Sequence, residues 1–236
     1  MKNELRICSA CGVKYTHDPL CFDGLDLMAH VTACPSCSEE IERIESKTQK
    51  ELAARERWES TVDPEYRKTS LDHPDFPRPI YHECLRWMRR ELPADENKTF
   101  LGLTGLSGLC KTRVVAMIVK NLIWRGEHVT WVNSARFQWC CQTQFNDTHG
   151  REAQSLLGAF RQTRNLVFDD LGAIKSTEIV CENLYSLLEF RTANGLRMIW
   201  TSNESLSEIL AGKSLTEKSR GRCISRLGGF SKIIEL

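Results

Sequence analysis

Short apolar runs alternate with longer segments of helical periodicity in the second part of the chain. Each apolar run is short enough to be one buried strand, and the runs cover residues 98–104, 128–132, 165–168, 197–201 and 231–236. The intervening segments repeat apolar residues at the spacing of a helix face, at 111–125, 151–163 and 176–192. Strands that alternate with helices are typical of a parallel sheet covered on both faces. The pattern therefore predicts an α/β fold with a five-stranded parallel sheet.

The pattern upstream of residue 98 is different. Residues 38–60 carry many Glu, Lys and Arg side chains and few apolar ones, which indicates a solvent-exposed helix. Four prolines at positions 64, 74, 77 and 79 exclude a long helix or a central strand. Residues 81–93 predict a short amphipathic helix. We therefore expect three parts, namely a module at 1–45, a charged helix and Pro-rich linker at 46–80, and a main domain at 81–236.

The cysteines support a separate N-terminal module. Five of the 11 cysteines lie in the first 37 residues. Cys8 and Cys11 form one Cys-x-x-Cys pair, and Cys34 and Cys37 form a second pair after 22 intervening residues. Two such pairs supply four thiolates from two tight turns, which is the ligand set of a tetrahedral zinc site. The spacing predicts a small zinc-ribbon-like domain.

Three nearby side chains are alternative zinc ligands that the sequence leaves open, namely Cys21, His17 and His30. A segment of about 40 residues has too little core to fold alone, so the metal would supply its folding free energy. The N-terminus has no apolar h-region, which favours a reduced, cytoplasmic chain over a secreted disulfide scaffold. No apolar run approaches the ~18 residues of a membrane helix.

Composition and charge add a little to this picture. A content of 27% charged and 41% hydrophobic residues is that of an ordinary globular protein. Residues 1–100 carry 15 basic against 19 acidic side chains, whereas residues 101–236 carry 17 against 12. This division favours a protein-contacting first part and a phosphate-facing second part, with an ordinary solvated surface as the alternative.

A glycine-rich loop lies between the first strand and the first helix of the main domain. It reads Gly105, Leu106, Ser107, Gly108, Leu109 and Cys110, followed by Lys111 and Thr112. In a phosphate-binding loop, backbone N–H groups and the helix N-terminus bind phosphate, the Lys neutralises the β- and γ-phosphates, and the Thr hydroxyl binds Mg²⁺. Cys110 stands where this pattern has its last glycine. A positive φ there would cost about 1–2 kcal/mol.

Polar residues follow two later strands. Asp169 and Asp170 end an apolar run 58 residues beyond Lys111. The first carboxylate can bind Mg²⁺, and the second can orient or deprotonate an attacking water. Asn203 follows the next strand, where its side chain can hold the attacking water or sense the γ-phosphate. By itself the Ser-Asn pair there is also a common turn.

Residues 98–236 resemble the AAA+ ATPase core of the DnaC/DnaI-type helicase loaders and of the related IstB transposition ATPases. The resemblance rests on GLSGLCKTR, LVFDDLGAIKS, WTSN and RCISRL in that order. It implies a sheet order of 5-1-4-3-2 without the helical lid of larger AAA+ proteins. It also implies that ATP and Mg²⁺ bind at the loop that ends at Arg113 and at Asp169. Catalytic roles fall to Asp170 as the catalytic acid position, Asn203 as the sensor, Arg226 as the arginine finger and Arg222 as its helper.

The same resemblance implies a function. The chain would be an ATPase that loads a hexameric DnaB-type replicative helicase onto single-stranded DNA in replication initiation, as an ATP-dependent homo-oligomer. A zinc-binding domain followed by a linker is also the plan of DnaI-type loaders, in which that domain grips the helicase. Two alternatives stay open, namely an IstB-like helper of a DNA transposase that binds duplex DNA, and a non-catalytic zinc adaptor whose nucleotide site is degenerate at Cys110.

Candidate DNA contacts follow the second predicted strand. Arg136, Phe137 and Trp139 combine a cation with two aromatic rings, which suits base stacking and phosphate binding. Packing of Phe137 and Trp139 in the core is the alternative. Lys175, just after the DDLG segment, is a further candidate, and for Arg222 and Arg226 a nucleic-acid-binding patch is the alternative to action in trans.

Overall fold

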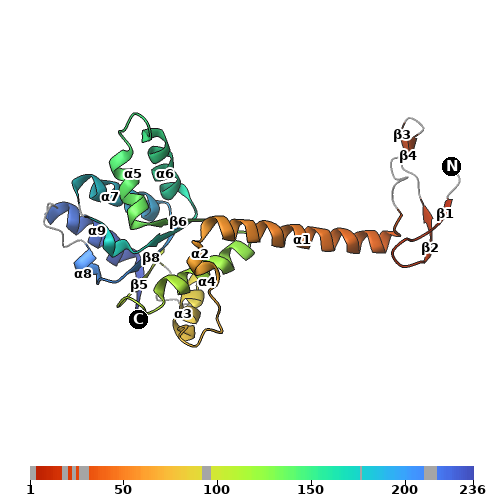
Figure 1. Ribbon diagram of the computed structural model, residues 1–236, viewed down its shortest axis with the longest axis horizontal. Helices are drawn as coiled ribbons and strands as arrows, with labels where there is room; N and C mark the ends of the chain where they lie inside the picture. Colours follow the sequence, from red (N-terminus) through yellow and green to blue (C-terminus); the bar gives the residue numbers. More distant parts are fainter. Residues whose placement is uncertain are drawn as a thin grey trace. The chain divides into compact units, whose positions relative to one another are not determined.

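The computed structural model describes residues 4–17, 21–22, 25–26, 32–91, 97–175, 177–209 and 217–236. The chain forms two compact units, Met1–Arg55 and Glu56–Leu236. Helix α1 (Pro35–Thr61) begins in the first unit and ends in the second (Figure 1). Within the described parts, no helix is both long and apolar enough to cross a lipid bilayer.

The first unit consists of two small antiparallel ladders and most of α1. Strand β1 (Glu4–Ile7) pairs with β2 (Lys14–His17), and β3 (Cys21–Phe22) pairs with β4 (Leu25–Asp26). Among its described side chains, the buried apolar ones are Cys8, Ala33 and Ala54. So little buried apolar surface does not stabilise a fold by itself. The described part of the unit is therefore expected to need another source of folding free energy.

The second unit is built on a five-stranded sheet. Its strands are β5 (Phe100–Thr104), β6 (Val129–Asn133), β7 (Asn165–Asp169), β8 (Arg197–Ser202) and β9 (Ser231–Glu235). All neighbouring strands are parallel, and they lie in the order β6-β7-β8-β5-β9. This arrangement confirms the α/β fold and the order 5-1-4-3-2. Because the strands are parallel, the carboxyl ends of β5, β7 and β8 meet at one edge.

Helices cover both faces of this sheet (Figure 1). One face carries α3 (Arg78–Met88) and α4 (Lys111–Trp124), which pack against each other. The other face carries α5 (Ser134–Thr143), α6 (Gly150–Gln162), α7 (Glu178–Ala193) and α9 (Glu217–Phe230). A short helix, α8 (Leu206–Ile209), follows β8. The helical periodicity in the sequence predicted α4, α6 and α7 to within two residues at each end, whereas it gave no separate prediction for α5 and α9.

A tryptophan organises the centre of the sheet. Trp200 on β8 is fully buried, and its ring lies directly against Gly102 on the neighbouring strand β5. A Cβ atom at Gly102 would lie 2.3 Å from that ring, so only glycine fits. The indole Nε1 donates a hydrogen bond of 3.0 Å to Ser231 Oγ on β9. One side chain thereby ties together three strands.

Residues 56–80, which the sequence analysis assigned to a charged helix and linker, belong to the second unit. Trp58, Val62 and Phe76 are buried there. The segment also contains a short helix, α2 (Pro64–Arg67), that packs against α4. The prolines prevent a long helix, as expected, but the aromatic and apolar side chains between them bind the segment to the core. Trp58 makes its contacts from the last turns of α1, whereas Val62 and Phe76 lie outside helices, where no periodic pattern marks their packing.

Candidate nucleotide-binding cleft and metal centre

The loop between β5 and α4 has the conformation that its glycines allow. Gly105 adopts φ 135° and Gly108 adopts φ 87°, both in the region that favours glycine. A Cβ atom on Gly105 would also lie 2.4 Å from the backbone carbonyl oxygen of Leu236. The loop therefore curves tightly and delivers the chain into the N-terminus of α4 at Lys111.

Cys110 occupies the residue position immediately before α4. Its backbone has φ 61° and ψ 18°, the left-handed conformation. This is the unfavourable case for a residue with a Cβ, and it costs about 1–2 kcal/mol. The side chain is half-buried and lines the cleft described below. The loop thus keeps the backbone path of a glycine-containing loop while carrying a thiol.

Lys111 is held at the mouth of this loop. Its Nζ donates hydrogen bonds of 2.8 Å to the carbonyl oxygens of Gly105 and Leu106, and one of 2.7 Å to Asn203 Oδ1. The side chain is buried, and burial lowers the pKa of Lys111 while the carboxylates of Asp170 and Asp169 act in the opposite direction. The structure therefore brings the predicted sensor residue Asn203 to the predicted phosphate-binding lysine.

Asp169 lies beside the first turn of α4. The hydroxyls of Thr112 and Thr201 donate hydrogen bonds of 3.1 Å and 2.7 Å to the same oxygen, Oδ1. Burial raises the pKa of Asp169, and these two hydrogen bonds oppose the rise. A carboxylate and a hydroxyl side by side are hard oxygen ligands of the kind that Mg²⁺ prefers. Thr201 was not among the predicted site residues, although it belongs to the WTSN segment.

Asp170 is fixed by its backbone. It adopts φ 55°, a strained conformation for a non-glycine residue. Its N–H donates a hydrogen bond of 2.8 Å to Thr201 Oγ1, and its carbonyl oxygen accepts a hydrogen bond from the Ser134 hydroxyl. These contacts leave the carboxyl group of Asp170 on the wall of the cleft.

The cleft itself has a volume of about 860 Å³. It is lined by four groups of residues: the loop and α4 residues Ser107, Gly108, Cys110, Lys111, Thr112 and Arg113; the strand-end residues Asn133, Asp169, Asp170, Thr201 and Asn203; the upstream residues Asp63, Glu65, Tyr66, His73 and Asp75; and Ser134, Ala135, Gln138 and Ala173, which follow β6 and β7 and were not predicted either. The first two groups were predicted in large part. The third was missed, because no motif marks residues 63–75 and only the packing of α2 on α4 brings them here.

Arg222 and Arg226 are not among the lining residues of this cleft. Both lie on α9, which packs against α7. Arg226 Nε donates a hydrogen bond of 2.6 Å to Glu189 Oε2. The Arg222 guanidinium lies 5.6 Å from the centre of the Tyr185 ring. In a single chain, therefore, neither arginine contributes to the nucleotide cleft.

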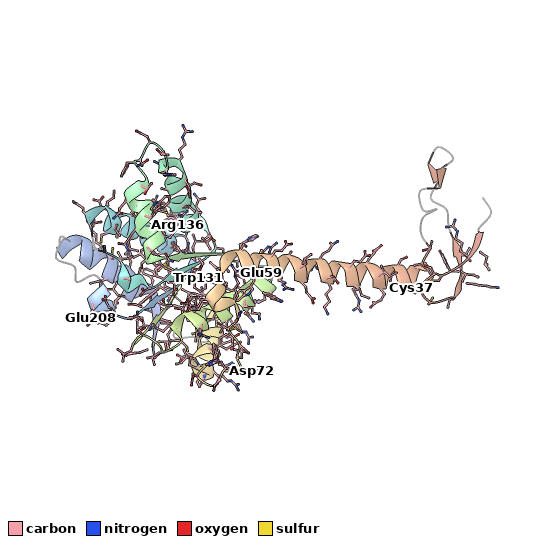
Figure 2. All side chains as sticks on the ribbon, in the orientation of Figure 1. Cys37, Glu59, Asp72, Trp131, Arg136 and Glu208 are labelled. Carbon is pink, nitrogen blue, oxygen red and sulfur yellow. The ribbon has the colours of Figure 1, made fainter. Side chains whose placement is uncertain are left out.

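The candidate DNA contacts differ in how far they are exposed to solvent. Phe137 is fully buried and packs against Phe168 with a centroid distance of 5.1 Å, so it is a core residue and its assignment as a DNA contact is withdrawn. Arg136, labelled in Figure 2, stacks on Trp139 at 4.3 Å and is bonded to Glu152 at 2.8 Å. Lys175 is exposed. A helix that buries one face places Phe137 inside and Arg136 outside, and the sequence left this choice open.

The four predicted zinc ligands come together in the first unit. The sulfurs of Cys8, Cys11, Cys34 and Cys37, here called the four-cysteine centre, all lie within 4.8 Å of one another. Zn–S bonds of about 2.3 Å in a tetrahedron place sulfurs ~3.8 Å apart, so the group fits zinc. Figure 2 shows Cys37 at the start of α1. The side chains of Cys21, His17 and His30 lie outside the described part of the chain.

Hydrogen bonds already differentiate these thiols. The backbone N–H of Cys34 donates a hydrogen bond of 3.2 Å to Cys8 Sγ. This bond is the main reason why the pKa of Cys8 is lowered to about 6. Hydrogen bonding among the thiols, first of all with Cys11, raises the pKa of Cys37 to about 12. Four thiols that compete for protons in one small volume release them when a divalent cation binds.

No protein-family model and no curated protein matches the chain. Among solved structures, DnaI matches with a TM-score of 0.55 at 19% identity, covering 77% of this chain and 89% of that one. The second unit has the AAA+ fold. The DnaC helicase loader matches at 0.52 with 17% identity, covering 74% of this chain and 99% of that one.

The AAA+ unit is also similar to a replication initiator. DnaA bound to AMPPCP and single-stranded DNA matches with a TM-score of 0.51 at 15% identity, over 74% of this chain and 51% of that one. At identities below 20%, such similarities establish the fold of the second unit alone.

Proposed function

We propose that this chain is an ATPase that loads a hexameric replicative helicase onto single-stranded DNA. The observation that carries the proposal is the convergence in one cleft of Lys111, Thr112, Asp169 and Asn203. These residues come from three separate strand ends of an AAA+ sheet. Their combination with a four-cysteine centre on the same chain favours a loader.

The cleft fits ATP with Mg²⁺. Lys111 would exchange the carbonyl oxygens of its own loop for β- and γ-phosphate oxygens. Thr112 and Asp169 would hold Mg²⁺, which neutralises charge that develops on the phosphates. Asp170 would take the catalytic acid position and orient the attacking water. Asn203 would sense the γ-phosphate, since its amide already contacts Lys111.

The arginines of α9 would act on a neighbouring subunit. Arg226 and Arg222 are outside the cleft of their own chain, yet an arginine finger raises the rate of phosphoryl transfer by stabilising negative charge. An ATP-dependent homo-oligomer would bring Arg226 of one subunit to the nucleotide of the next. Exchange of the Glu189 carboxylate for phosphate would then be the local event at Arg226.

The first unit would bind the helicase, and the AAA+ unit would bind DNA. Zinc on the four-cysteine centre would supply the folding free energy that the small apolar core lacks. Arg136 with Trp139 and Lys175 are the proposed contacts to single-stranded DNA. A chain with this role acts in the cytoplasm, where the helicase and the DNA are.

A loading assay tests the proposal. The substrate is a closed circle of single-stranded DNA coated with single-strand-binding protein, with an annealed labelled strand that the helicase displaces. We expect strand displacement that requires both this protein and ATP. Lys111→Ala should not support strand displacement. Lys175→Ala, which changes a proposed DNA contact, should still bind ATP. No stimulation of the helicase would contradict the proposal, and ATP-dependent binding of duplex DNA with recruitment of a transposase would favour the IstB-like alternative.

A further inference from the structure

Residues upstream of the AAA+ sheet reach the place where magnesium is expected. Asp63 and Tyr66 line the same cleft as Thr112 and Asp169. The short helix α2 that carries Tyr66 packs against α4, the helix that carries Thr112. Arg67 Nε donates 2.6 Å to the carbonyl oxygen of Val62, and this bond closes the turn before α2. The two upstream residues are therefore fixed on the AAA+ unit.

The chemistry of both side chains suits contact with bound water. The side chains of Tyr66 and Thr112 line the same cleft, and Thr112 opposes the rise in the pKa of Tyr66. Burial, with the carboxylates of Glu65 and Asp169, raises the pKa of Tyr66, so its hydroxyl is neutral and can both donate and accept. Asp63 precedes α2, but its carboxylate makes no capping hydrogen bond there. That carboxylate is close enough to Asp169 to help raise the pKa of Asp169.

A magnesium ion in this cleft would carry water ligands that the side chains of Tyr66 and Asp63 could contact. Mg²⁺ takes six ligands in an octahedron and usually keeps several waters beside one or two protein oxygens and the phosphates. Here Thr112 and Asp169 are the two protein oxygens, so the remaining waters need partners on the open side of the cleft. Residues in the outer shell of a metal site orient its ligands and change its affinity.

We propose that Tyr66 and Asp63 are positioning residues that hold the water ligands of Mg²⁺ in the nucleotide cleft. The inference rests on the proposed function, because it assumes that MgATP occupies this cleft. It adds that residues 63–66, outside the phosphate loop and the strand ends, set the magnesium affinity of the site. The negative charge of Asp63, Asp169 and Asp170 would also oppose the attraction of Lys111 for ATP, and a bound cation would offset this charge.

The test separates magnesium from nucleotide. Binding of ATP is measured by isothermal titration calorimetry on the full chain, once with EDTA and once with MgCl₂, and the MgCl₂ concentration for half-maximal binding is then determined. For Tyr66→Phe and for Asp63→Asn we expect about a tenfold higher magnesium requirement, with the affinity for ATP in EDTA unchanged or, for Asp63→Asn, improved. Tyr81→Phe is the matched control, since it removes a tyrosine hydroxyl outside the cleft.

Three results would overturn the inference, and a fourth would overturn the proposed function. An unchanged magnesium requirement in both variants would overturn the inference while wild-type MgATP binding upholds the proposed nucleotide site. Tighter MgATP binding by Tyr66→Phe would mean that the tyrosine obstructs the metal position, which also overturns the inference. Equal weakening with EDTA and with MgCl₂ would show damage to the nucleotide pocket rather than loss of contacts to the water ligands, and would overturn it too. Absence of ATP binding by the wild-type chain would remove the proposed function itself.

Discussion

At the scale of single residues, the phosphate loop could be located from sequence because its chemistry is local. Glycines, a lysine and a threonine at fixed spacing determine both the turn and its charge. The conformation of Cys110 was left open, and the structure places it at φ 61°. Tyr66 was missed because its role depends on the packing of a turn-rich segment, which produces no periodic pattern.

Cys110→Gly tests the strain at this position. Glycine adopts positive φ freely, so we expect the free energy of unfolding to rise by about 1 kcal/mol, after allowance for the greater entropy of the unfolded chain. The measurement is urea denaturation followed by circular dichroism. Cys110→Ala is the control, because it removes the thiol but keeps the Cβ atom. An equal gain from alanine would show that the thiol, and not the backbone, is unfavourable.

At the scale of elements, strands and amphipathic helices were predictable because each one is written in consecutive residues. Their junctions were not. Arg191 on α7 is fully buried, and its guanidinium donates hydrogen bonds to backbone carbonyls that include those of Phe160 and Thr163, each at 2.9 Å. It satisfies the carboxyl end of α6 and the turn into β7. Burial lowers the pKa of Arg191 to about 9.

Arg191→Leu is expected to lower the free energy of unfolding by about 3 kcal/mol, because several buried carbonyl oxygens lose their donor at once. The measurement is the shift of the urea midpoint, compared with that of Arg151→Leu on the exposed face of α6. A similar, small effect of both substitutions would mean that water replaces the guanidinium, and the bracing role of Arg191 would be wrong.

Removal of the metal expected at the four-cysteine centre should affect the first unit and not the second. A strong chelator is expected to unfold the segment around the four-cysteine centre, because its described residues include few buried apolar side chains, while the candidate nucleotide cleft retains its structure. The readouts are rapid proteolysis within the first unit and an unchanged affinity for ATP. Resistance of that segment to protease after complete metal removal would show that it folds without zinc.

At the scale of the whole molecule, the sheet order was implied by the family resemblance alone, and the structure confirms it. The placement of residues 56–80 differed from expectation, because Trp58 and Phe76 add buried area that composition alone does not reveal. The assembly of subunits is likewise beyond a single-chain pattern. In the proposed oligomer, it would depend on where the α9 arginines contact a neighbouring subunit.

Arg226→Ala tests that assembly. We expect the variant to bind ATP with unchanged affinity but to lose ATP hydrolysis and ATP-dependent oligomerisation, because the missing guanidinium belongs to the neighbour's site. Calorimetry and analytical ultracentrifugation with ATP provide the two readouts. Arg222→Ala, one turn earlier on α9, should cause a smaller defect. Loss of ATP binding in Arg226→Ala would instead place this arginine in its own subunit's site or in the stability of α9.

We propose that the chain joins a helicase-binding zinc unit to an ATP-dependent AAA+ unit. The most direct test is size-exclusion chromatography with light scattering of the full chain mixed with a hexameric replicative helicase, with and without ATP. We predict a stable complex heavier than the helicase hexamer in ATP. The double variant Cys34→Ser/Cys37→Ser should not form it, although it should still bind ATP. No complex under any nucleotide condition, or a complex that forms equally well without the cysteines, would contradict the account.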